Sequence, residues 1–259
     1  MIHQGSNKRI RAQALGVSPK NIYKQSLQEV KDLRLKAAIE QVHIQHPAYG
    51  HRRVAWELGL NPKRVRRVMR KYEIKPPRRK VRGWCTKSTS HHTYINLIKD
   101  LPPQYPNHIW CSDISYLKFQ GKNWYLATIQ DQYTRQIIAV QVGTKHDSHL
   151  ILSVLKQGLR VTIPKIFHSD QGTEFMAKIC TQYLESKNIQ ISVSDAASPW
   201  QNGYQESFFG RFKAEFGDCS RFETAGELIA EIYAQIRYYN HHRIHTALKM
   251  PPVTYANSF

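Results

Sequence analysis

The sequence predicts an α/β domain built on a mixed sheet, preceded by a small all-helical region. From His108 onward, three strand-like runs come first, and helix-like and strand-like segments then alternate. This is the order of a mixed sheet covered by helices. The positive charge, in contrast, is concentrated in the first third of the chain. We expect a helical DNA-binding region at 1–74, a linker at 75–104 and the α/β domain at 105–259.

The charge distribution indicates a polyanionic partner for the helical region. Residues 1–90 contain 22 basic and 5 acidic residues, whereas residues 91–259 contain 16 and 14. Basic residues that neutralise phosphates release condensed counterions, so a region of this kind binds nucleic acid with a strong dependence on salt.

A helix-turn-helix is expected within this basic region. One helix is predicted near 51–58, Gly59 provides the turn, and Asn61 and Pro62 have the character of an N-cap and a first helical residue. The second helix is placed to contact DNA, and its basic residues are Lys63, Arg64, Arg66, Arg67, Arg70 and Lys71. A solvated basic face is the alternative, because short helix pairs are common.

The predicted linker begins with basic residues around Pro76 and Pro77, and Gly, Ser, Thr and His follow up to about Thr93. A short helix is expected at 94–101. In the α/β domain, the expected strands are 109–117, 123–130, 136–142, 165–168 and 189–194, and the expected helices are 148–159, 174–187, the segment around Glu206, and 224–240. A domain of this length buries a full core.

Three carboxylates stand where acids are locally out of place. Asp113 interrupts the apolar run IWCSDISYL, and Asp170 ends the run KIFHSD directly before a turn that contains Gly172. Glu206 lies in a helix-like segment with start signals at Ser198, Pro199 and Asn202 and an apolar stripe at Phe208, Phe209, Phe212 and Phe216. Taken singly, each acid has an ordinary explanation as a strand-edge, turn or solvated helix residue.

Taken together, the three acids predict a cation site. Packed carboxylates repel one another and lose hydration, so holding them together is costly unless a cation compensates. Magnesium prefers carboxylate oxygens and keeps positions for water and phosphate. Two such ions activate the attacking oxygen and stabilise the leaving oxygen in phosphoryl transfer. We therefore expect two Mg²⁺ ions, with Mn²⁺ as a substitute, and phosphodiester cleavage or exchange.

The sequence segments around these acids resemble those of a known family. WCSDISYL, HSDQGTEF and SPWQNGYQESFFGRFKAE are similar, in order and spacing, to the three catalytic motifs of bacterial insertion-sequence transposases of the retroviral-integrase type. The resemblance is to the second-reading-frame protein of the insertion-sequence-three family. It extends over nearly the whole chain through LGVSPKNIY, HPAYGHRRV, NPKRVRRVMRKY and YYNHHRIHTAL.

The resemblance implies a ribonuclease-H-like catalytic core in which Asp113, Asp170 and Glu206 bind the metal ions, with Asp113 shared between both. It also implies that Lys213 meets DNA near the reacting phosphate. Water first cuts at the end of the element, and the freed 3′ hydroxyl then attacks a second phosphodiester. The implied partners are element ends and target DNA, further copies of the chain on DNA, and an upstream-frame protein or its fusion.

Two other functions stay open at this point. A transposase that has lost catalysis would act as a DNA-binding regulator and need none of the acids. A stand-alone ribonuclease-H-like nuclease would share the metals but lack strand transfer.

Other candidate chemistry is weaker. The four cysteines have no paired short spacing, which argues against a zinc site or a disulfide framework. His241 and His245 have i, i+4 spacing, but we interpret them as a helix end. We interpret Asp131 as structural, and His168 and Trp200 as either DNA-positioning or packing residues. Without a signal peptide or an apolar span, we expect a cytoplasmic protein of the bacterial nucleoid.

Overall fold

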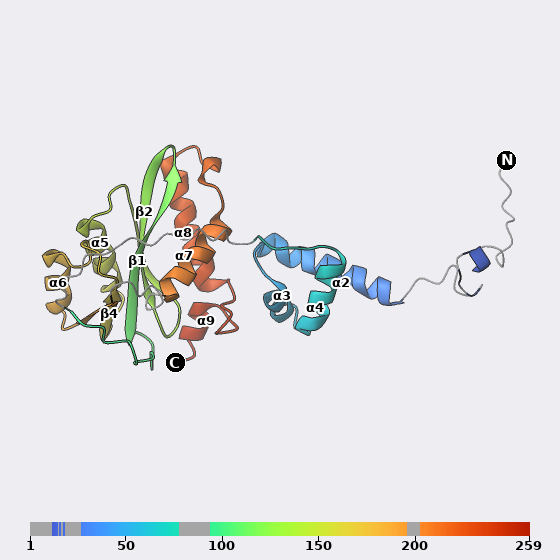
Figure 1. Ribbon diagram of the computed structural model, residues 1–259, viewed down its shortest axis with the longest axis horizontal. Helices are drawn as coiled ribbons and strands as arrows, with labels where there is room; N and C mark the ends of the chain where they lie inside the picture. Colours follow the sequence, from blue (N-terminus) through green and yellow to red (C-terminus); the bar gives the residue numbers. More distant parts are fainter. Residues whose placement is uncertain (1–11, 15, 17, 19–26, 78–93, 196–202) are drawn as a thin grey trace. The chain divides into compact units, whose positions relative to one another are not determined.

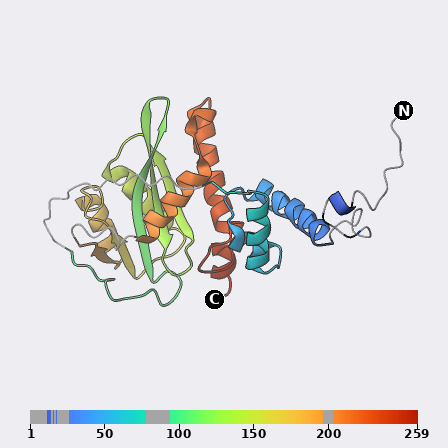
Figure 2. The same cartoon turned by 45° about the vertical axis from the view of Figure 1, so that its right-hand side comes forward.

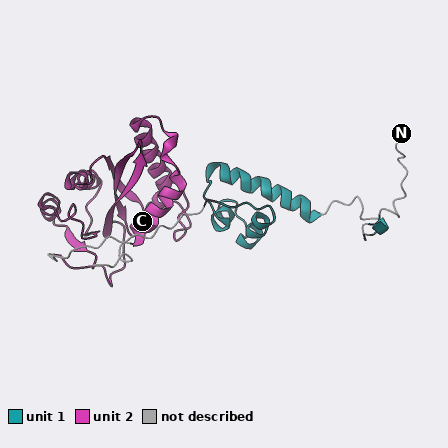
Figure 3. Ribbon diagram, turned by 45° about the horizontal axis from the view of Figure 1, so that its top comes forward, with its two compact units in different colours: residues 1–76 teal, residues 77–259 magenta. Residues whose placement is uncertain are grey.

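The computed structural model describes residues 12–14, 16, 18, 27–77, 94–195 and 203–259. It divides the chain into Met1–Pro76 and Pro77–Phe259, which Figure 3 colours separately. Several predicted features lie outside the described residues: most of LGVSPKNIY, linker residues 78–93 with Cys85, and the segment with Ser198, Pro199, Trp200 and Asn202. Among the described helices, none is long and apolar enough to cross a membrane.

From residue 27 onward, the first unit contains α2 (Leu27–Gln45), α3 (His51–Glu57) and α4 (Pro62–Lys71) (Figure 1). Gly59 has φ +62°, the left-handed conformation that a tight turn between two helices requires and that glycine adopts without strain. The predicted cap of α4 is confirmed, because the Asn61 side chain accepts a hydrogen bond from the Lys63 amide at 2.8 Å.

Helix α2 is fixed to α4 by a buried acid. Asp32 is only 1% exposed, and its carboxylate accepts hydrogen bonds from both terminal nitrogens of Arg67 and, at 3.2 Å, from Lys71 Nζ. Lys71 also pairs with Glu29. These donors hold the pKa of Asp32 well below its usual range, with Arg67 as the largest cause. A charge-assisted network therefore sets the position of α4 against α2.

The second unit is built on a five-stranded sheet in the order β3-β2-β1-β4-β5, which confirms the predicted mixed sheet. The strands are β1 (Ile109–Phe119), β2 (Lys122–Asp131), β3 (Ile137–Gly143), β4 (Ile166–Ser169) and β5 (Gln190–Val193). The first three are antiparallel hairpin neighbours, and β4 runs parallel to both β1 and β5. The central strand β1 therefore joins the antiparallel and parallel halves of the sheet.

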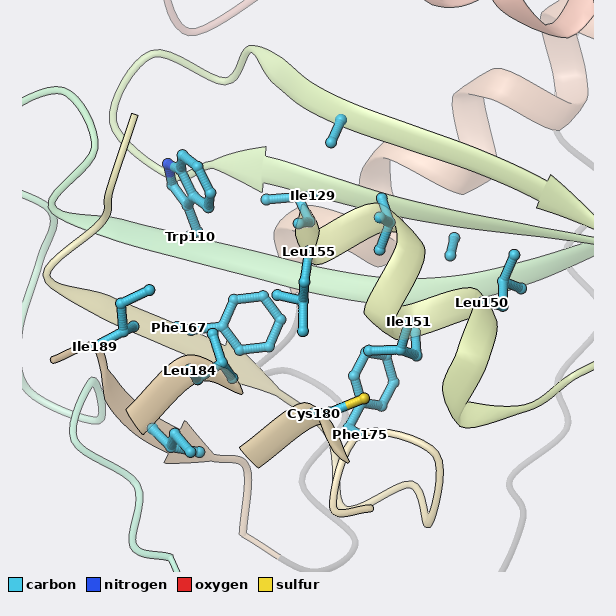
Figure 4. Close-up of a cluster of buried hydrophobic side chains, with 14 of the residues drawn as sticks. Trp110, Ile129, Leu150, Ile151, Leu155, Phe167, Phe175, Cys180, Leu184 and Ile189 are labelled. Carbon is cyan, nitrogen blue, oxygen red and sulfur yellow. The ribbon is translucent and has the colours of Figure 1, made fainter. Parts of the chain in front are cut away.

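Helices cover both faces of this sheet (Figures 1 and 2). On one face, α5 (Ser148–Gly158) and α6 (Lys178–Glu185) enclose a core that includes Trp110, Ile129 and Phe167 (Figure 4). On the other face lie α7 (Gly203–Phe216) and α8 (Ala225–His241), and the predicted phenylalanine stripe of α7 is buried there. The chain continues from α7 through a short 3-10 turn, η2 (Cys219–Arg221), and from α8 to α9 (Pro252–Ala256).

The YYNHHRIHTAL segment fastens α8 to the domain. Tyr239 donates a hydrogen bond to the Arg135 carbonyl, and the Asn240 side chain bonds both the amide and the carbonyl of Ile137 on the edge strand β3. Arg243, 1% exposed, donates to the Glu215 carboxylate on α7 with distances of 2.6–2.9 Å. The segment has a clear structural role in holding α7, α8 and the sheet together.

Two predicted helices differ in the structure. The prediction of a helix at 94–101 is wrong: residues 97–100 form only a turn, while the Ile95 carbonyl accepts from the Val193 amide and the Leu97 amide donates to Ser192 Oγ. Pairing with the edge strand β5 replaces helical bonding there. The helix expected at 174–187 begins at Lys178, since the loop after Asp170 first closes its own turn with hydrogen bonds to the Gly172 carbonyl.

Candidate active site

The strand register places Asp113 and Asp170 side by side. β1 and β4 are parallel neighbours with Cys111 opposite His168, and each aspartate lies two residues beyond its strand's member of that pair. Residues two apart point to the same face of a strand, and neighbouring strands are about 4.8 Å apart. The two carboxylates therefore emerge at the same level of adjacent strands, where the β1–β4 ladder has just ended.

Asp113 lies in a strongly perturbed environment. Its side chain is half-buried, and its Oδ1 accepts a hydrogen bond from the Ile114 amide at 2.8 Å. Burial, then the charge of Asp170 and, to a smaller extent, that of Glu206 raise the pKa of Asp113 to about 8 against the opposing effects of the Ile114 amide and Lys213. The charges of Asp170 and Glu206 therefore both act on Asp113 in the folded protein.

Asp170 begins a tight loop that brings a further acid close to it. The Gly172 amide donates to Asp170 Oδ1 at 3.0 Å, and a Cβ atom on Gly172 would lie 2.5 Å from Glu174 Oε1 and 3.0 Å from Asp170 Oδ1. A larger residue at position 172 would require the Glu174 side chain to move. Burial of the carboxyl group and the charge of Glu174 raise the pKa of Asp170, although the residue as a whole is exposed. His146, 3.4 Å from Glu174, partly offsets this repulsion.

Glu206 lies in the first turn of α7 and is exposed. Its neighbour Gln205 is fully buried and bonds to both β1 and β2, a contact that sequence patterns did not predict, because a glutamine beside an acid in a polar run is typical of a solvated helix start. Further along α7, Lys213 lies with Nζ 4.7 Å from the centre of the exposed Tyr116 ring and lowers the pKa of Asp113. Lys213 therefore lies near enough to Asp113 for its charge to act on that carboxyl.

The basic residues of α4 fall into two groups. Arg67 and Lys71 are engaged with the acids of α2, so they stiffen the first unit. The exposed remainder, available to a polyanion, is Lys63, Arg64, Arg66 and Arg70.

The carboxylate arrangement fits cations held by pairs of acids. Within the described ranges, no three His, Cys, Asp or Glu side chains are grouped around one metal-sized position. The acids whose charges act on Asp113 are Asp170 and Glu206. Two carboxylates for each ion leave positions for water and phosphate, which is the coordination that magnesium prefers. Burial and, after it, the charges of Asp170 and Glu206 raise the pKa of Asp113, and a cation would compensate the charge.

His168 and Asp131 have structural roles. His168 is fully buried and bonds Ser192 Oγ at 2.9 Å and Ser194 Oγ at 3.0 Å, which ties β4 to β5. Asp131 accepts hydrogen bonds from the amide and hydroxyl of Thr134, as expected of a turn residue. Through these hydrogen bonds, both side chains stabilise the strands and the turn close to the carboxylates.

His168 should make the protein less stable in mild acid. Burial lowers the pKa of His168 to about 4, whereas an unfolded histidine titrates near 6.5, so the unfolded chain gains a proton first as the pH falls. Stability is fully present above pH 6.5 and falls toward pH 4, by about 2 kcal/mol at pH 5. Urea unfolding of the wild type and His168→Gln at pH 7 and 5 measures this. Equal losses in both proteins would contradict it.

The fold and the paired strand carboxylates define an integrase-type catalytic core. Residues 103–199 match the family model described as "Integrase core domain", and residues 187–252 match a second model with the same description. A transposase-like protein of Haemophilus influenzae is 33% identical over 76% of this chain and 94% of its own length. The 31 kDa protein of insertion element IS600 from Shigella sonnei is 30% identical over 91% and 93%. The chain belongs to the insertion-sequence-three family of insertion-element transposases.

A solved structure agrees on the fold alone. The simian T-cell lymphotropic virus intasome, in complex with the PP2A regulatory subunit B56 gamma, contains a chain that is 15% identical to this one, with a TM-score of 0.54. The match covers 86% of this chain and 75% of that chain.

Proposed function

We propose that this protein is a DNA transposase that cuts and joins DNA by metal-dependent phosphoryl transfer at Asp113, Asp170 and Glu206. The observation that carries the proposal is the strand register, which places Asp113 and Asp170 at the same level of β1 and β4, with Glu206 in the first turn of α7 near enough to raise the pKa of Asp113. Acids that repel one another in a half-buried site are retained for chemistry more readily than for stability. The family membership supports a substrate with phosphodiester bonds.

The residues have distinct roles in this proposal. Asp113 and Asp170 would hold one Mg²⁺, and Asp113 and Glu206 would hold the other. When bound, these ions stabilise the charge on the attacking and leaving oxygens. Lys213, close to Asp113, pairs with a DNA phosphate and so orients the reacting strand. No residue of the chain needs to form a covalent intermediate.

DNA is held by a second set of contacts in the first unit. Lys63, Arg64, Arg66 and Arg70 are exposed on α4, and the pairing of Asp32 with Arg67 fixes the helix that presents them. Basic contacts to phosphates position a protein on DNA without reading sequence. Strand transfer on two element ends favours several copies of the chain acting together, so the proposed active form is a multimer on DNA, with the upstream-frame protein as a further partner.

A strand-transfer assay with labelled element ends and Mg²⁺ tests this function. The wild type is expected to form joined products, and Glu206→Gln should lose about 10²-fold or more, because one ion loses a ligand and an ion contributes several kcal/mol to the transition state. The control is Glu231→Gln, an exposed acid on α8, which should join DNA at the wild-type rate.

The outcomes separate the alternatives. Nicking without joining by the wild type favours the stand-alone nuclease. If the wild type only binds DNA, and adding the upstream-frame segment also produces no joining, then the DNA-binding regulator is the better description and the proposed function is wrong.

A further inference from the structure

The side chain of Gln205 is buried without exposed surface at the start of α7. Its Nε2 donates to the Cys111 carbonyl at 2.6 Å, and its Oε1 accepts from the Thr128 hydroxyl at 3.1 Å. A buried amide is costly unless its polar atoms are paired, and here both ends are. The pairing is therefore specific to one position of the helix relative to the sheet.

Both partners of Gln205 lie directly beside Asp113. Cys111 precedes Asp113 by two residues on β1, and Thr128 is the residue opposite Asp113 on β2. Gln205 in turn precedes Glu206. The Gln205 side chain thus connects the strands around Asp113 to the turn of α7 that carries Glu206, and both acids are predicted metal ligands.

The rest of α7 does not supply this precision. The helix packs through Phe208, Phe209, Phe212 and Phe216, and apolar contacts of this kind are not directional. Glu206 itself is exposed, so packing around its side chain does not set its direction. The hydrogen bonds of Gln205 do have direction, and they fix the rotation and height of the first turn of the helix.

We propose that Gln205 is a positioning residue, which locks the first turn of α7 to β1 and β2 so that Glu206 faces Asp113 and the two carboxylates share a metal ion. The inference rests on the proposed function and adds a role that acts through Glu206. Tyr204, stacked under the Arg135 guanidinium at 3.7 Å, is a second attachment of the same turn. This attachment should keep α7 folded when Gln205 is changed.

The test compares two buried amides in the full-length protein. Gln205→Met keeps the shape and removes both hydrogen bonds. Asn240→Leu is the matched control, because it also removes two hydrogen bonds between a helix and the sheet, but at β3, which β2 separates from β1. Three quantities are measured for each: the joining rate at saturating DNA and Mg²⁺, the Kd for DNA, and the Mg²⁺ concentration at half of the metal-induced rise in Tm.

Gln205→Met is expected to lower the joining rate by about 10- to 100-fold, since small displacements of a catalytic group cost that much. Its Kd for DNA should stay within about twofold, and its Mg²⁺ midpoint should rise several-fold because the shared ion loses pre-organised ligands. Asn240→Leu should lower Tm to a similar degree while its rate and Mg²⁺ midpoint stay close to those of the wild type.

A second pair of variants keeps the test decisive if Gln205→Met folds poorly. Thr128→Ser retains the hydroxyl and should keep the wild-type rate, whereas Thr128→Val should lose part of it. An unchanged Mg²⁺ midpoint in Gln205→Met and Thr128→Val, with a wild type that joins DNA, overturns this inference alone. A wild type with neither joining nor a Tm response to Mg²⁺ overturns the proposed function as well.

Discussion

Replacing Asp113 with asparagine is expected to remove DNA joining, by about 10³-fold or more, while making the metal-free protein more stable. The loss of activity follows because Asp113 is proposed to serve both ions, and each ion stabilises the transition state by several kcal/mol. The gain in stability has a separate cause. Burial and the neighbouring acids raise the pKa of Asp113 from 3.8 to about 8, so ionising this residue is easier in the unfolded chain.

The pH dependence of this gain has a definite sign. Because the pKa of Asp113 is higher in the folded protein than in the unfolded chain, the free energy of unfolding falls as the pH rises from 3.8 through 8. Asp113→Asn removes the loss, so it should raise the free energy of unfolding at pH 7 by about 4 kcal/mol and change it little at pH 4. Thermal unfolding at the two pH values measures this.

Magnesium provides the control for the same variant. The ion binds the folded state and should raise the Tm of the wild type at pH 7.5 but not that of Asp113→Asn. A variant that is less stable than the wild type at pH 7.5 without metal would show that Asp113 contributes to the framework, contrary to the electrostatic argument.

Removing Glu215 should destabilise the protein by about 3–5 kcal/mol, because it leaves the Arg243 guanidinium buried without its anionic partner. Arg243 has a side chain that is 1% exposed, and Glu215 is its ion-pair partner at 2.6 Å. The expected result is a lower urea midpoint for Glu215→Ala at neutral pH. The double variant Glu215→Leu/Arg243→Met should recover most of the loss, since no buried charge then remains.

The control is an exposed pair in the same domain. Arg221 and Glu231 are 3.5 Å apart, with side chains 49% and 45% exposed. Exposed pairs contribute about 0–1 kcal/mol, so Glu231→Ala should change the unfolding free energy by less than 1 kcal/mol. A similar cost for Glu215→Ala and Glu231→Ala would argue against the fastening role of Arg243.

Local signals predicted much of the fold. The cap at Asn61, the five strands and the amphipathic α7 follow from residue types within one or two turns, and the structure places them within a few residues of the expectation. The wrong prediction at 94–101 had a non-local cause: the backbone of Ile95 pairs with β5, almost one hundred residues further along the chain. Periodicity in a short window carries no information on such a partner.

In the candidate site, too, some residues stand out from local sequence, whereas others depend on partners far along the chain. Asp113 and Asp170 stand out in the sequence because an acid within or at the end of an apolar run is locally unusual, whereas their equal level on β1 and β4 emerges only from the strand register. Arg67 and Lys71 have the same local signature as Arg66 and Arg70, and only the buried Asp32 on another helix distinguishes them. Gln205 was missed because its partners, Cys111 and Thr128, belong to distant strands.

The placement of Glu206 on α7 has a consequence for protein synthesis. The ribosome completes α2, α3 and α4 long before α7, and domains generally fold as units during synthesis, the amino-terminal one first. The two strand carboxylates, Asp113 and Asp170, are also made before the helix that carries Glu206. A nascent chain therefore gains its basic α4 surface early and its third carboxylate late, so on the proposed function the DNA-binding surface is made before the cutting site is complete.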